Sequence, residues 1–145
     1  MRYLGLDLGT KTLGLAVSDL TNTIATSIGI IRFENEKYDD TYESLKKIID
    51  DYNITHIVLG LPKNMNTSIG FRGNTTLEYK KLLEYWFNIK VVMQDERLTT
   101  VEATNYMLEA NLSRKKRKKS IDSLAASIIL QSYLDMIRKD EKNGK

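Results

Sequence analysis

Residues 3–11 read Tyr-Leu-Gly-Leu-Asp-Leu-Gly-Thr-Lys and predict the first strand of a sheet. Leucines at positions 4, 6 and 8 alternate with other residues, which predicts a strand with one apolar face. Asp7 stands on the other face, inside an otherwise apolar run. Because a buried carboxylate needs a cation or hydrogen-bond donors around it, Asp7 is a candidate ligand. The alternative is a turn aspartate that accepts hydrogen bonds from the amides of residues 9–12.

The rest of the chain continues this strand into an alternating pattern. Strands over 13–18 and 24–33 complete an opening three-strand meander. Helices and strands then follow in turn: a helix over 39–52, a strand over 56–61, a polar loop over 63–74, a helix that starts with the capping box at 75–78, a strand over 90–94, a helix that starts with the capping box at 99–102, and a last helix over 121–137 capped by Ser120.

This order of elements predicts an α/β three-layer fold with a mixed five-stranded sheet. The last three strands alternate with helices, as parallel crossover connections require. A chain of 145 residues has the usual size of one domain, which we expect over residues 1–139, followed by a frayed tail over 140–145. In such sheets, sites gather at the carboxyl ends of the parallel strands.

Composition excludes several kinds of chemistry. The sequence has no cysteine, so thiol nucleophiles, disulfides and cysteine-ligated zinc fingers lack their residues, and histidine-based chemistry would depend on a single histidine. The lone His56 is better explained as a strand-end residue than as a metal ligand. No apolar run approaches the roughly 20 residues that span a bilayer, and Asp7 and Lys11 interrupt the N-terminal stretch where a signal peptide stays apolar. We therefore expect neither export nor a membrane partner.

Positive charge is concentrated in one short segment. The chain has 22 Lys and Arg against 19 Asp and Glu, a net charge of +3. Without the run at 114–119 the remainder is −3, so this run supplies the whole excess. Runs of like charge are often interaction segments, which predicts contact with a polyanion; the alternative is a solvated loop. The run consists of Arg114, Lys115, Lys116, Arg117, Lys118 and Lys119.

Two further carboxylates are candidates to join Asp7. Asp95 and Glu96 follow the fifth predicted strand, and only one of them can readily face the site because adjacent side chains point to opposite faces. The pair could equally be a charged strand end partnered by Arg97. Asp122 stands in the first turn of the last helix, where the helix dipole alone would favour an acidic residue.

Convergence of three such carboxylates would create a metal site. Oxygen ligands alone favour a hard cation such as Mg²⁺ or Mn²⁺. Two such ions can activate water and stabilise the leaving oxygen in phosphodiester hydrolysis, which needs no histidine.

Four blocks of sequence closely resemble the YqgF/RuvX family, in order and in spacing, from residue 2 to about 135. One block alone would be a weak indication, whereas four together are highly specific. The blocks are LGLDLGTK at 4–11 with GLAVSD at 14–19, LGLPKNMN at 59–66, DERLTTVEA at 95–103 and IDSLAA at 121–126.

The resemblance implies a ribonuclease H-like fold and a cytoplasmic, metal-dependent nuclease. The family is described as Holliday junction resolvases related to RuvC, with bacterial members implicated in processing the 5′ end of precursor 16S ribosomal RNA. The implied partners are an rRNA precursor or branched DNA, and ribosomal particles. By motif, Asp7, Glu96 and Asp122 correspond to the catalytic acidic triad that holds Mg²⁺ or Mn²⁺. Substrate contacts are implied for Lys11, Lys63, Asn64, Arg72 and Arg97.

The chain departs from the family pattern in one loop, and two other functions stay open. Thr67 stands where the family usually has glycine, and Phe71 where proline is common.

The first block also resembles the phosphate loop of actin, Hsp70 and sugar kinases, which enclose ATP between two such domains, whereas this chain has the length of one. A noncatalytic module that binds RNA through the basic run is the stronger alternative. A resolvase that makes two symmetric cuts would be a two-fold dimer, whereas trimming one RNA end needs only a monomer.

Overall fold

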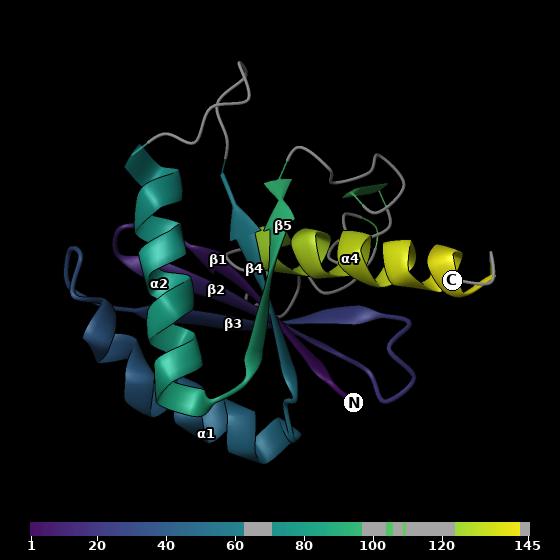
Figure 1. Cartoon of the computed structure of the whole chain (residues 1–145), viewed down its shortest axis with the longest axis horizontal. Coiled ribbons are helices and arrows are strands. Elements are labelled where there is room, and N and C mark those ends of the chain that lie inside the picture. The colour runs from purple at the N-terminus through teal and green to yellow at the C-terminus, as the bar shows by residue number, and fades with distance from the viewer. Residues whose placement is uncertain (63–70, 97–103, 106–108, 110–123, 143–145) are drawn as a thin grey trace.

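The computed structural model describes residues 1–62, 71–96, 104, 105, 109 and 124–142 of the chain, with side chains omitted at 71–73 and 142. It shows a five-stranded sheet with helices on both faces (Figure 1). The expected α/β class and the mixed sheet are confirmed. The expected loop covers 63–74, and its residues 63–70 lie outside the described part of the chain. The helix expected after residue 99 is described at 104, 105 and 109 alone, and these three residues are helical.

The sheet has the strand order β3-β2-β1-β4-β5. Its opening meander is antiparallel, whereas β1, β4 and β5 run parallel. The carboxyl ends of these three neighbouring strands therefore lie at one edge. The strands span Tyr3–Leu8 (β1), Thr12–Ser18 (β2), Ala25–Arg32 (β3), His56–Leu61 (β4) and Lys90–Asp95 (β5).

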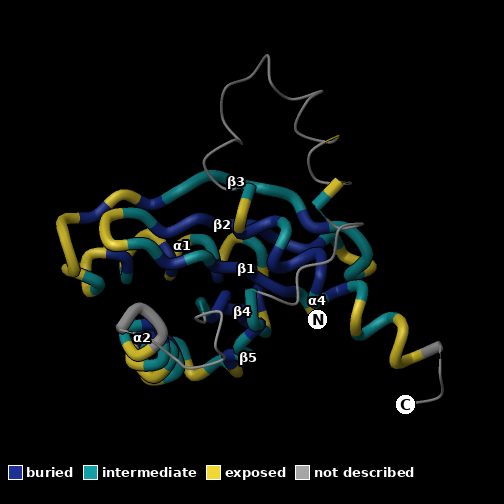
Figure 2. Tube along the Cα trace, turned by 90° about the horizontal axis from the view of Figure 1, so that it is seen from above, coloured by how far each residue is buried: buried dark blue, intermediate teal, exposed yellow. Residues whose placement is uncertain are grey.

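Strand alternation divides the side chains between two cores. Leu4, Leu6 and Leu8 face the layer formed by α1 (Tyr42–Tyr52) and α2 (Phe71–Phe87), in the larger core. Tyr3 and Val58 face α4 (Leu124–Lys142) on the other side of the sheet. Figure 2 shows the buried residues concentrated in the strands between these layers. Asp7 shares its face with Tyr3, so it lies on the side of α4.

Glycine in β1 lets α4 approach the sheet closely. A Cβ atom on Gly5 would stand 2.7 Å from Cβ of Leu130 and 3.1 Å from the carbonyl oxygen of Ala126. Both atoms belong to rigid parts of α4, so a side chain at Gly5 would force the helix away. The side chain of Gln131 holds α4 from its other flank, because it accepts a hydrogen bond from the Ala25 amide and donates one to the Thr23 carbonyl, each 2.9 Å long.

Three helix boundaries differ from those expected. The first helix begins as a 3₁₀ turn, η1 (Tyr38–Thr41), before α1. α2 begins at Phe71, four residues before the capping box at Thr75. No proline separates the two positions, and a single glycine costs a helix only about 1 kcal/mol, so the helix extends backwards through Gly73. α4 continues to Lys142, so residues 140–142 of the expected tail are helical. Among the described residues, no helix has the length and apolar character needed to cross a membrane.

Candidate active site

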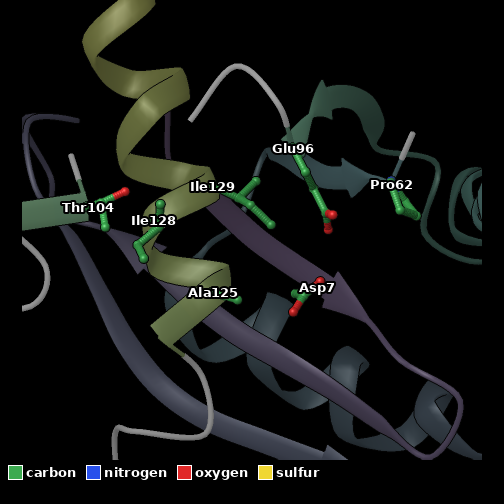
Figure 3. Close-up of a pocket in the computed structure, with 7 residues that line it drawn as sticks. All are labelled: Asp7, Pro62, Glu96, Thr104, Ala125, Ile128 and Ile129. Carbon is green, nitrogen blue, oxygen red and sulfur yellow. The ribbon is translucent and has the colours of Figure 1, made fainter. Parts of the chain in front are cut away.

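A cavity of about 520 Å³ lies where the carboxyl ends of the parallel strands meet the start of α4. Figure 3 shows the carboxylates of Asp7 and Glu96 directed toward the same space. Two acidic groups that are 89 positions apart in the sequence thus share one cavity. Its lining consists of Asp7, Pro62, Glu96, Thr104, Ala125, Ile128 and Ile129.

Asp7 reaches the cavity because of its place in β1. It pairs with Gly14 of the neighbouring β2, so no side chain stands beside it on that strand. Its carboxylate is half-buried between the sheet and α4. The turn that follows β1 is closed by a 2.8 Å hydrogen bond from the amide of Gly9 to the carbonyl of Thr12. Backbone groups therefore close that turn.

The register of β5 decides between the two acidic residues at its end. Gln94 pairs with Gly60 and Asp95 with Leu61, and successive residues of a strand face opposite sides of the sheet. Gly60 faces α4, because a Cβ atom on it would meet Ile129, so Asp95 faces the other side. Glu96 therefore returns to the α4 face, where it lines the cavity. Its Oε1 lies 3.4 Å from the point that a Cβ atom on Gly60 would occupy.

One wall of the cavity is apolar. Ala125, Ile128 and Ile129 all come from the first turns of α4, and Thr104 adds a hydroxyl-bearing side chain beside Ile128 (Figure 3). Ala126, the neighbour of Ala125, is instead fully buried against the sheet. Apolar surface beside the carboxylates lowers the local dielectric constant and so strengthens their interaction with a cation. Thr104 carries no signal in the sequence that would mark it as a site residue, whereas Gly60 does, because glycine inside a strand often marks a close approach.

The other expected site residues fall into three groups. Lys11 is exposed in the turn after β1 and does not line the cavity. Arg72 lies in α2, but its side chain is not described. The remaining expected residues lie outside the described part of the chain: Lys63, Asn64, Arg97, Asp122 and the basic run 114–119.

His56 begins β4, at the end of the strand remote from the cavity. Its Nδ1 lies 2.8 Å from the hydroxyl of Thr55, and its ring centroid lies 5.1 Å from that of Tyr3. Burial and the nearby Lys90 lower the pKa of this imidazole. The expectation that His56 is a strand-end residue is confirmed.

The donor chemistry of the cavity fits a hard divalent cation. Asp7 and Glu96 present carboxylate oxygens, and the rest of the described lining has no sulfur or imidazole ligand. Within the described ranges, no group of three His, Cys, Asp or Glu side chains is close enough to hold a metal ion. The described residues include only two of the three carboxylates expected at this site.

Solved structures of resolvases share this fold. T. thermophilus RuvC in complex with Holliday junction substrate matches with a TM-score of 0.69 at 11% identity, covering 97% of this chain and 96% of RuvC. The fowlpox virus resolvase in complex with Holliday junction DNA matches with a TM-score of 0.54 at 19% identity, covering 94% of this chain and 99% of the viral protein. At these identities the likeness shows the fold, which is ribonuclease H-like.

The family model and the curated relatives, together with this fold, define the chain as a ribonuclease H-like nuclease, a hydrolase of phosphodiester bonds. A family model described as "RuvX: Holliday junction resolvase" matches residues 1–136. The chain belongs to the RuvX family. A Clostridium botulinum (strain Eklund 17B / Type B) protein named "Putative pre-16S rRNA nuclease" is 55% identical over 139 residues, which cover 96% of this chain and 100% of that relative.

Proposed function

We propose that Asp7, Glu96 and Asp122 bind Mg²⁺ or Mn²⁺ and that the chain cleaves structured nucleic acid at this site, with the 5′ end of precursor 16S rRNA as its substrate. The observation that carries the proposal is the convergence of Asp7 and Glu96 on one cavity from two parallel strands. Two half-buried carboxylates at one cavity repel each other, and a cation bound between them would offset that repulsion.

Chain connectivity supports Asp122 as the third ligand. Ala125 lines the cavity, and Asp122 stands three positions before it. Three peptide units reach at most about 11 Å, so the carboxylate of Asp122 is within reach of the cavity. Three carboxylates from one domain would complete an oxygen-only ligand set.

The chain's own residues have separate tasks in this proposal. When bound, the divalent ions supply an activated water and charge stabilisation at the leaving oxygen. Asp7 and Glu96 hold the ions from the sheet, and the apolar wall from α4 limits access of bulk water to the carboxylates. Lys11, Lys63, Asn64, Arg72 and Arg97 contact the phosphates that flank the scissile bond.

The rRNA substrate rests on the relatives and on charge. A relative 55% identical to this chain carries the name of a pre-16S rRNA nuclease. The run at 114–119 contributes six positive charges to a chain that is otherwise net negative, which suits a polyanion. We propose that the protein acts in the cytoplasm on the precursor within ribosomal particles, as a monomer. Branched DNA, the substrate bound by the matched RuvC and fowlpox structures, is the second candidate and would require a two-fold dimer.

A cleavage assay tests the nuclease proposal. Wild type and Asp7→Asn are incubated with Mn²⁺ or Mg²⁺ and, side by side, an rRNA-precursor fragment and a four-way junction. We expect wild type to cut the precursor in a metal-dependent manner, and Asp7→Asn to bind it without cutting. Equal cleavage by both proteins would place the activity elsewhere, and metal-independent binding without cleavage would favour the noncatalytic RNA-binding module.

A further inference from the structure

A second cavity, of about 770 Å³, lies between η1, α1 and α2, on the face of the sheet opposite α4. Its lining consists of Asp39, Tyr42, Leu82, Tyr85 and Trp86, which we call the aromatic groove. Three of these five side chains are aromatic and one is a carboxylate. The nuclease site uses none of them.

Two rings of the groove are held in fixed positions. Tyr42 meets Trp86 edge to face, with ring centroids 5.3 Å apart and an interplanar angle of 73°. The other neighbour of Tyr42 is Phe87, which stacks on it at 5.5 Å with planes 5° apart. Packing therefore preorganises this corner, and a ligand need not order it.

The third ring is exposed without a packing role. Tyr85 is 84% exposed, one of four large hydrophobic side chains that are exposed among the described residues. Tyr85 adjoins Leu82 and Trp86 in the groove, and a continuous surface rich in aromatic side chains is typical of a binding surface.

The charges around the groove favour a cationic ligand. Each lysine described in α1 and α2 is paired with a carboxylate of its own helix: Lys46 with Asp50, Lys47 with Asp51, Lys80 with Glu84 and Lys81 with Glu78.

Three acidic side chains beside the groove have no such partner. Within the described part of the chain, Asp39, Asp40 and Glu43 make neither an ion pair nor a side-chain hydrogen bond. The unpaired charge on this face is therefore negative, which opposes a phosphate backbone and attracts a cation.

From these observations we infer that the aromatic groove binds an arginine side chain from a basic segment of a partner protein. A guanidinium group stacks on the faces of Tyr and Trp and pairs with a carboxylate, and the groove offers both. Asp39 pairs with the guanidinium group while Tyr42, Tyr85 and Trp86 surround its plane. The inference is independent of nuclease activity, because it uses no residue of the acidic cavity.

Trp86 is the single tryptophan of the chain, so its fluorescence reports on the groove. The wild-type protein is titrated with acetyl-Gly-Ser-Arg-Gly-Arg-Ser-Gly-amide, and then with the same peptide carrying citrulline, a neutral isostere, for arginine. No nucleic acid or divalent ion is present, so failure of this test and failure of the nuclease proposal are distinguishable. We expect a saturable change with the arginine peptide and binding at least threefold weaker with the citrulline peptide.

Three variants locate the binding. Asp39→Asn and Tyr85→Ala should each lower the affinity for the arginine peptide about threefold to tenfold. Asp40→Asn, which removes the same charge one residue away from the lining, should change affinity less than twofold. All three positions are exposed, so circular dichroism melting curves should match wild type.

Three results would overturn the inference. Equal binding of the arginine and citrulline peptides would show that no cation is recognised. A single-stranded RNA hexamer that quenches Trp86 in wild type and fails to do so in Tyr85→Ala would make the groove a base-stacking site. Concentration-dependent dimerisation in sedimentation velocity that Tyr85→Ala abolishes would make it an interface between two copies.

Discussion

The carboxylate of Glu96 lies over Gly60, with Oε1 3.4 Å from the point that a Cβ atom on Gly60 would occupy. The same point is 2.6 Å from Cδ1 of Ile129, which lines the cavity from α4. The absence of a side chain at Gly60 therefore lets the end of β5 and the start of α4 meet above β4. The spacing of the proposed metal ligands depends on this contact.

Replacing Gly60 with alanine should impair cleavage by displacing these neighbours. A contact of 2.6 Å forces Ile129 or the helix to move, and misplacement of catalytic groups by about 1 Å can lower a rate up to a hundredfold. We expect Gly60→Ala to lower kcat at least tenfold in the metal-dependent assay, with nucleic acid binding changed much less.

Ile129→Val supplies the matched control, because valine lacks Cδ1. By itself it should lower the free energy of unfolding by about 0.5–1.5 kcal/mol and change kcat little. Combined with Gly60→Ala it should restore most of the lost kcat. If the double variant is as slow as Gly60→Ala, the contact with Ile129 does not explain the loss.

The two acidic residues at the end of β5 should differ sharply in their effects. Glu96 lines the cavity, whereas Asp95 pairs with Leu61 and points to the other face. Loss of residues that merely orient metal ligands lowers activity about 10- to 100-fold, so Glu96→Gln should lower kcat by at least 100-fold.

Asp95→Asn should stay within about threefold of wild type in the same assay, since it removes one charge outside the cavity. Calorimetric titration should show weaker binding of Mn²⁺ to Glu96→Gln and unchanged binding of Mn²⁺ to Asp95→Asn. Similar losses in both variants would contradict the assignment from strand register.

Tyr79 should make stability depend on alkaline pH. Its hydroxyl lies 2.7 Å from Thr41 Oγ1, and Thr41 already donates to the carbonyl of Tyr38, so the phenol is the donor to Thr41. Burial raises the pKa of Tyr79 far above its ordinary value of 10.0. The folded protein therefore keeps this proton above pH 10, while the unfolded chain releases it.

Unfolding is thus favoured as pH rises through this range. The free energy of unfolding should fall by about 1.4 kcal/mol per pH unit above pH 10 from this group alone. Urea denaturation from pH 8 to 11 measures the free energy of unfolding of wild type and of Tyr79→Phe. The variant should be about 1 kcal/mol less stable than wild type below pH 9. The difference in the free energy of unfolding between the two proteins should narrow as pH rises. A constant difference would contradict a raised pKa of Tyr79. Tyr3 and Tyr133, whose pKa values burial also raises, are present in both proteins.

The run at 114–119 should control the salt dependence of nucleic acid binding. Each phosphate contact contributes about 0.7–0.9 to the slope of log affinity against log salt concentration. Replacing Arg114 to Lys119 with neutral residues should flatten that slope by about one unit or more, measured by fluorescence anisotropy from 50 to about 300 mM salt. An unchanged slope would indicate a solvated loop.

Local sequence sufficed for most of the strands. β1 begins and ends at the residues that alternation predicted, because the side-chain period of two acts within a strand. The same rule placed Asp7 on the face opposite Leu6. β4 has the bounds expected of a short, β-branched run that ends before Pro62. The capping-box rule gave a wrong start for α2, because the capping box at Thr75 lies inside a helix that begins at Phe71. A capping motif reports a preference of one turn, and with no proline before it the helix continues backwards through Gly73.

The order of residues is enough to show which positions alternate, which charges cluster and which carboxylates stand in or directly after apolar strands, since these are properties of neighbours along the chain. Tertiary structure alone decided that Asp7 and Glu96 share a cavity, that Gly60 makes room for Glu96 and Ile129, and that Tyr42 and Trp86 form a groove. Each of these contacts joins segments far apart in sequence. Strand order and the distance of the helices from the sheet set them, and both result from packing the whole core at once.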